Sequence, residues 1–105
     1  MALEIARSEA GPGELITATG DVDLYSSPQL REAILKAIEK GKGAVGVALG
    51  AVSYMDSSGV ATLVEGFKAC GDKKKPFVLV APSPQVMKVL ELSRLHSVFE
   101  IREEF

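Results

Sequence analysis

The stretch Val52-Ser53-Tyr54-Met55-Asp56-Ser57-Ser58-Gly59-Val60 decides how this chain is organised, because an apolar strand ends in it and a helix begins in it. Asp and Ser favour helix N-caps, since their side-chain oxygens accept N–H groups of the first turn that lack an intrahelical partner. One such residue is enough for a cap. Three in a row, followed by Gly, also place hydroxyls where free N–H groups and the helix dipole favour an anion. The stretch therefore has two interpretations, a simple cap or a serine that carries a phosphoryl group.

Around this turn the chain alternates between strand and helix patterns. Runs of alternating or wholly apolar residues predict strands, and apolar residues spaced three and four apart predict helices. The predicted strands cover residues 2–8, 15–19, 44–49 and 77–80, with a short last strand within 96–101. Helices are predicted from Ser26 or Ser27 to Gly41, from the Asp56-Ser57-Ser58-Gly59 turn to Gly71, and from Pro82-Ser83-Pro84-Gln85 onward.

The first two helices carry specific expectations. Either Ser26 caps the first helix with Gln29 reaching back, or Ser27 caps it with Pro28 at the first helical position. The polar segment 20–27 before it is expected to be a loop. The residues expected to face the core from the second helix are Val60, Leu63, Val64 and Phe67.

The element order is β-β-α-β-α-β-α-β, which predicts an α/β fold in a single domain over residues 1–105. The Gly11-Pro12-Gly13 turn joins the first two strands closely, so they should form an antiparallel hairpin. Strands separated by a helix must cross over and should be parallel. We therefore expect a mixed sheet of about five strands, with helices covering at least one face.

Composition excludes several classes of function. Hydrophobic residues make up 47% and charged residues 25% of the 105 residues, which is typical of a folded domain. The net charge of −2 lacks the basic footprint of a nucleic-acid binder. No apolar run reaches membrane-spanning length, so no membrane insertion is expected. The single cysteine, Cys70, excludes an internal disulfide, and the expected location is the cytoplasm.

A phosphoryl group on Ser57 would change the surface without requiring the fold to change. It would bring roughly −1.5 to −2 charges and three acceptor oxygens to the helix N-terminus. Asp56 is adjacent, and Asp21 and Asp23 follow another strand. If these loops converge on one edge of the sheet, phosphorylation sharpens a patch that is already acidic, and a partner that fits the neutral hydroxyl would be repelled.

Catalytic and metal-binding interpretations find less support. A serine hydrolase needs a base beside its nucleophile, but the only histidine is His96, and the turn lacks the G-x-S-x-G elbow. Asp21 and Asp23 offer two carboxylates, with no His/Cys cluster or calcium-loop spacing to complete a metal site. We expect no catalysis, no metal and no cofactor.

Two stretches together resemble a known family. Gly20-Asp21-Val22-Asp23 before one helix and Val52 to Gly59 before another are similar to the anti-sigma factor antagonists, which are STAS domains (sulphate transporter and anti-sigma factor antagonist). The resemblance spans essentially the whole chain. It implies that Ser57, directly after the Asp, is the phosphoacceptor, with Ser58 as the alternative. It also implies that Asp23 faces the partner kinase.

The resemblance further implies a partner-switching role without catalysis. The partner is a serine kinase that doubles as an anti-sigma factor. It binds the unphosphorylated antagonist and releases the sigma factor; phosphorylation reverses this, and a phosphoserine phosphatase resets it. The residues expected to contact the partner are Asp21, Asp23, Tyr25, Ser26, Asp56, Ser58 and Gly59.

Two departures from the family pattern keep a second role open. Ala48 stands where the family often has Asp, and Gly59-Val60-Ala61 replaces the usual Gly-Leu-Gly. Stand-alone STAS proteins also serve lipid-transporting ABC complexes, where the same surface docks on the ATPase or the permease. That alternative makes the chain a docking subunit without catalysis.

Overall fold

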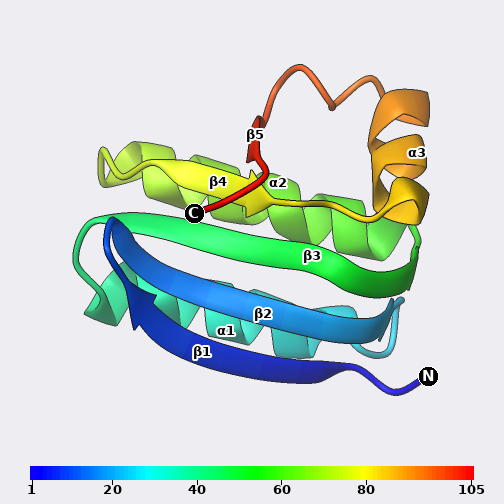
Figure 1. Cartoon of the computed structure of the whole chain (residues 1–105), viewed down its shortest axis with the longest axis horizontal. Helices are drawn as coiled ribbons and strands as arrows, with labels where there is room; N and C mark the ends of the chain where they lie inside the picture. Colours follow the sequence, from blue (N-terminus) through cyan, green and yellow to red (C-terminus); the bar gives the residue numbers. More distant parts are fainter.

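The computed structural model, which describes residues 1–105, contains five strands and three helices in the predicted β-β-α-β-α-β-α-β order (Figure 1). The strands are β1 (Glu4–Ala10), β2 (Gly13–Val22), β3 (Ala44–Met55), β4 (Phe77–Val80) and β5 (Glu100–Arg102). The helices are α1 (Ser27–Lys40), α2 (Ser57–Asp72) and α3 (Pro84–Leu92).

All five strands form one mixed sheet in the order β1-β2-β3-β4-β5. The β1–β2 pair is an antiparallel hairpin, while β2–β3, β3–β4 and β4–β5 are parallel. This confirms the predicted topology. The parallel pairs are the ones whose strands are separated by a helix, as a crossover connection requires.

The core lies between the sheet and two helices. Figure 1 shows α1 and α2 side by side behind the sheet, while α3 stands at one end, where it packs against β3. A cluster of 21 buried residues fills the space between these layers. On the opposite face, the ring of Phe105 covers Gly46, where an added Cβ would lie 2.7 Å from the ring.

Two strands are longer than the sequence predicts. β2 continues past Thr19 to Val22 and β3 continues past Leu49 to Met55, because the two pair with each other up to Val22 and Met55. Residues 20–22, expected in a loop, are therefore strand. The register shifts twice near these ends, and β3 buries Val52 and Met55 while it exposes the two residues between them.

The buried face of α2 also differs from the predicted one. Val60 and Leu63 are buried as expected, but Val64 is half-buried and Phe67 is 37% exposed. Thr62, Gly66 and Cys70 are buried instead. A Cβ on Gly66 would lie 2.9 Å from Ile34 Cγ2, so the missing side chain lets α2 lie close against α1. The partly exposed ring of Phe67 packs edge-to-face on Phe99, with 5.7 Å between the ring centroids.

Gly20 should tolerate no side chain, although it lies within a strand. Its φ is +109°, and an added Cβ would lie 2.4 Å from the carbonyl oxygen of Ala2. We expect Gly20→Ala to lower the free energy of unfolding by about 1–3 kcal/mol, measured by urea denaturation. The matched control is Gly71→Ala in α2, where the added methyl group meets open space. Equal urea midpoints for the two variants would contradict the prediction.

Candidate functional site

The two polar segments singled out in the sequence meet at one edge of the sheet. Val22, the last residue of β2, pairs with Met55, the last residue of β3. The backbone N–H of Asp56 donates to the carbonyl oxygen of Val22 over 3.2 Å. The loop that leads into α1 and the turn that leads into α2 therefore leave the sheet side by side, as the phosphorylation hypothesis requires.

Asp56 alone caps α2. Its Oδ1 atom accepts from the backbone N–H of Ser58 at 2.9 Å and of Gly59 at 3.4 Å. The simple-cap interpretation is therefore right for the aspartate. The following Gly59 is buried, and a Cβ there would lie 2.6 Å from Met55 Cγ. Because Gly59 has no side chain, the first turn of α2 packs tightly against the end of β3.

The two serines of the turn are placed differently. Ser57 is the first residue of α2 and is exposed, and its hydroxyl takes no part in the cap. Ser58 is half-buried, with its N–H bound by Asp56 and its carbonyl oxygen accepting from Thr62 Oγ1 at 3.0 Å. The more accessible of the two predicted acceptors is therefore Ser57.

The loop before α1 is held by its own polar groups. Asp23 Oδ1 accepts from the backbone N–H groups of Tyr25 at 2.9 Å and of Ser26 at 3.0 Å. The hydroxyl of Ser26 accepts from the N–H of Asp23 at 2.9 Å and donates to the carbonyl oxygen of Asp21 at 2.9 Å. This arrangement is a closed turn with little freedom left in its backbone.

Ser26 is the N-cap residue of α1, as the first expectation had it, but the capping contacts expected from Ser26 and Gln29 are wrong, and so is the alternative that Ser27 is the cap. Ser26 stands at the N-cap position, but its hydroxyl binds the preceding loop and no N–H of the helix. Gln29 reaches the carbonyl oxygen of Leu3, at 3.4 Å, and does not reach back to the cap. Ser27 is already helical. The competing partners come from β2 and the N-terminal segment, which local sequence spacing does not reveal.

Asp21 lies at the open side of the same edge. The Met1 ammonium group donates to Asp21 Oδ2 at 2.6 Å, and Ser53 Oγ donates to Oδ1 at 2.8 Å. These donors, the ammonium group first, hold the pKa of Asp21 below its ordinary value. Asp21 thus ties β2 to β3 beside the turn.

Two exposed side chains of this edge were not predicted from the sequence. Leu24 is 65% exposed and Tyr54 is 51% exposed, beside the predicted Tyr25, which is 90% exposed. Leu24 could have been found from the sequence, because it is an apolar residue within a polar loop. The exposure of Tyr54 depends on the register shifts between β2 and β3, which leave no mark in the sequence.

The histidine that a serine hydrolase would need lies outside the Ser57 turn. His96 is exposed between α3 and β5 and shares no hydrogen bond with Ser57. No group of three or more His, Cys, Asp or Glu side chains is placed to hold a metal ion. Burial raises the pKa of the Cys70 thiol to about 11. Thiolate, the reactive form, is therefore scarce at neutral pH.

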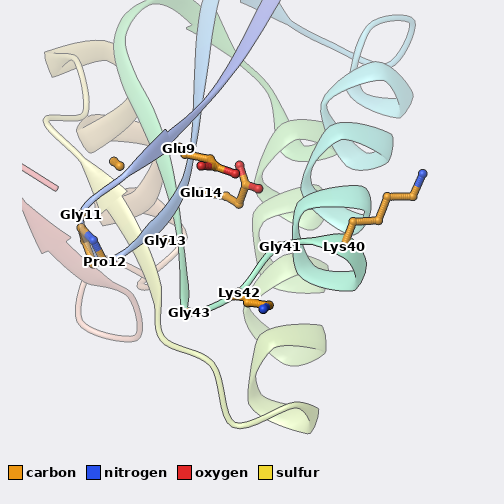
Figure 2. A pocket seen from close by; sticks show the side chains of 10 residues that line it. Glu9, Gly11, Pro12, Gly13, Glu14, Lys40, Gly41, Lys42 and Gly43 are labelled. Carbon is orange, nitrogen blue, oxygen red and sulfur yellow. The ribbon is translucent and has the colours of Figure 1, made fainter.

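A cavity of about 570 Å³ lies at the other end of the strands, where Gly13 pairs with Ala44 (Figure 2). Glycine-rich loops line most of it, and the side chain of Lys40 points away from it. This cavity is separate from the edge that carries Ser57.

No helix of the protein has the length and apolar character to cross a membrane.

Comparison with known proteins matches this geometry to a family. A family model described as "Mlab, STAS domain" matches residues 5–102. The anti-sigma-B factor antagonist of Listeria monocytogenes is 32% identical over 88 residues, which cover 83% of this chain and 76% of that protein. The chain therefore belongs to the STAS domain family.

Solved structures show the same fold. An anti-sigma factor antagonist from Mycobacterium paratuberculosis superposes with a TM-score of 0.87 at 20% identity, covering 99% of this chain and 88% of that one. The antagonist SpoIIAA in its unphosphorylated form has a TM-score of 0.78 at 25% identity, covering 93% and 87%. Phosphorylated SpoIIAA, from Bacillus, has a TM-score of 0.72 at 23% identity, covering 93% and 90%.

Loss of the cap should be separable from loss of the acceptor hydroxyl. Asp56→Ala removes the acceptor of two N–H groups, and we expect it to lower the free energy of unfolding by about 1 kcal/mol. Ser57→Ala removes a hydroxyl outside the cap and should leave stability nearly unchanged. Thermal unfolding of both variants checks this. An equal loss in Ser57→Ala would show that its hydroxyl also supports the helix end.

The pKa of Asp21 should respond to Ser53. Ser53→Ala removes a donor to the carboxylate, so the pKa of Asp21 should rise toward its ordinary value of 3.8. A depressed folded-state pKa stabilises the fold above the unfolded pKa, and this stabilisation is lost as the pH falls through the folded value. An NMR titration of the Asp21 carboxyl carbon measures the change. Ser8→Ala, in β1, is the control, and identical titrations in both variants would refute the link.

Proposed function

We propose that this protein is an anti-sigma factor antagonist of the cytoplasm, controlled by phosphorylation of Ser57. Unphosphorylated, it binds a serine kinase that also serves as the anti-sigma factor, and so frees the sigma factor. Phosphorylation ends this binding, and a phosphoserine phosphatase restores it. The observation that carries the proposal is the exposed Ser57, which directly follows the capping Asp56 at the edge where the loop held by Asp23 also leaves the sheet.

The cap explains why phosphorylation would act on the surface. Asp56 already accepts the N–H groups of Ser58 and Gly59, to which a phosphoryl group at this helix end would otherwise turn. A phosphoryl group on Ser57 would then meet the capping carboxylate at close range and project toward solvent. It would add roughly −1.5 to −2 charges to an edge that carries Asp21, Asp23 and Asp56.

This change in charge is large enough to operate a binding switch. An interface that buries a neutral hydroxyl becomes unfavourable when a dianion must be desolvated in the same place. A penalty of about 2–5 kcal/mol is typical for an unpaired buried charge at an interface. At about 1.4 kcal/mol for each factor of ten, it would weaken binding roughly 30- to 4,000-fold.

The relatives support this role. The Listeria monocytogenes relative is an anti-sigma-B factor antagonist. SpoIIAA has been solved both unphosphorylated and phosphorylated, and this chain superposes on both forms. An antagonist of this kind is a substrate and a binding partner of enzymes, so we propose no catalysis for the chain itself.

Intact-mass spectrometry tests the proposal directly. The protein is incubated with ATP and an anti-sigma serine kinase from its own host organism. We expect a gain of one phosphoryl group in the wild type and in Ser58→Ala, and none in Ser57→Ala, because the exposed hydroxyl belongs to Ser57. The Ser57→Asp variant should no longer bind the kinase in a pull-down.

Other outcomes would count against the proposal. No gain in the wild type, or a gain that persists in both serine variants, would refute phosphorylation at this turn. Stable co-purification with a transporter ATPase, unaffected by Ser57→Asp, would instead support the docking-subunit alternative.

A further inference from the structure

Two largely apolar side chains at the tip of the loop before α1 are exposed to solvent. Leu24 is 65% exposed and Tyr25 is 90% exposed, and the two are consecutive in the chain. Single exposed apolar residues are common on protein surfaces and need no explanation. A consecutive pair at the tip of a loop, next to the predicted phosphoacceptor, is a different case.

The loop backbone is fixed in the conformation that exposes them. Asp23 Oδ1 accepts from the N–H of Tyr25, and the carbonyl oxygen of Asp23 accepts from the N–H of Ser27 at 2.8 Å. Ser26 closes the other side through Asp21. Because these bonds use the backbone and the polar side chains, neither Leu24 nor Tyr25 contributes its side chain to the turn.

The exposure of the pair therefore does nothing for the fold itself. In a flexible loop, the two side chains would gain free energy by turning back toward the protein. Here the hydrogen bonds of the turn keep the tip away from the core. A rigid loop that presents a leucine and a tyrosine has already lost the conformational entropy that binding usually costs.

We propose that Leu24 and Tyr25 form an anchor that inserts into an apolar pocket of the partner kinase, and this inference rests on the proposed function. The anchor is continuous with the Ser57 turn, since β2 and β3 end side by side. Its surroundings are acidic, with Asp23 in the same loop and Asp56 across the edge. The fitting pocket is therefore apolar, with lysine or arginine at its rim.

The anchor and Ser57 have separate tasks under this assignment. A buried tyrosine with an adjoining leucine supplies binding energy at the centre of an interface. The energy is available before and during phosphoryl transfer, so it sets the affinity for the kinase and leaves the chemical step alone. Phosphorylation of Ser57 then triggers dissociation of the complex, and the anchor determines the specificity for one kinase.

Kinetics with the kinase that phosphorylates Ser57 test the anchor. We expect the double variant Leu24→Ser with Tyr25→Ser to raise KM for phosphorylation of Ser57 roughly tenfold or more, with kcat unchanged. The dissociation constant, measured by calorimetry with a non-hydrolysable ATP analogue, should rise by a similar factor. Tyr25→Phe keeps the apolar ring and should retain most of the affinity.

The matched control is Leu92→Ser at the end of α3. Leu92 is 77% exposed and lies outside both loops, so KM should stay at the wild-type value. Circular dichroism and urea unfolding of each variant verify the fold. The substitutions remove no side chain that takes part in the hydrogen bonds of the loop. Unchanged KM and affinity in a folded double variant would overturn the anchor and leave the proposed function standing. Failure of the wild type to bind the kinase would overturn both.

Discussion

The parallel pairing of β2 with β3 fixes where the two polar segments of this protein lie. It runs from Gly13 opposite Ala44 to Val22 opposite Met55, and it ends with a hydrogen bond from Asp56 to Val22. Because both strands stop at the same level, the segments that follow them begin side by side. A shorter pairing would leave the loop before α1 and the turn before α2 apart, and no common surface would exist.

Both segments are rigid, because in each of them an aspartate side chain accepts backbone N–H groups. Asp56 accepts the N–H groups at the start of α2, and Asp23 accepts those at the tip of its loop. The aspartates therefore hold the backbone as well as add negative charge. This arrangement leaves the side chains of Ser57, Leu24 and Tyr25 exposed and outside these hydrogen bonds.

Much of the fold was predictable because it rests on local patterns. The element order, the antiparallel hairpin and the parallel remainder follow from short apolar runs, turn residues and helical spacing. The ends of β2 and β3 were not, since polar residues such as Asp21 and Ser53 belong to strands only because they pair across the sheet. The predicted capping contact of Ser26 was wrong for a similar reason, because the Ser26 hydroxyl donates to the carbonyl oxygen of Asp21 in β2. The burial of Gly66 in α2 depends on close contact with α1, which the helical pattern alone does not reveal.

The fold class, the family resemblance and the turn that holds Ser57 were all readable in the amino-acid sequence, because periodicity and capping preference act over a few neighbouring residues. The folded chain was needed to show that Asp56 is the cap, that Ser57 is more exposed than Ser58 and that Leu24 and Tyr25 are exposed to solvent at the same edge. Exposure and hydrogen-bond partners depend on what the rest of the chain places nearby. For this edge, that neighbourhood is set by two strands pairing over their full length.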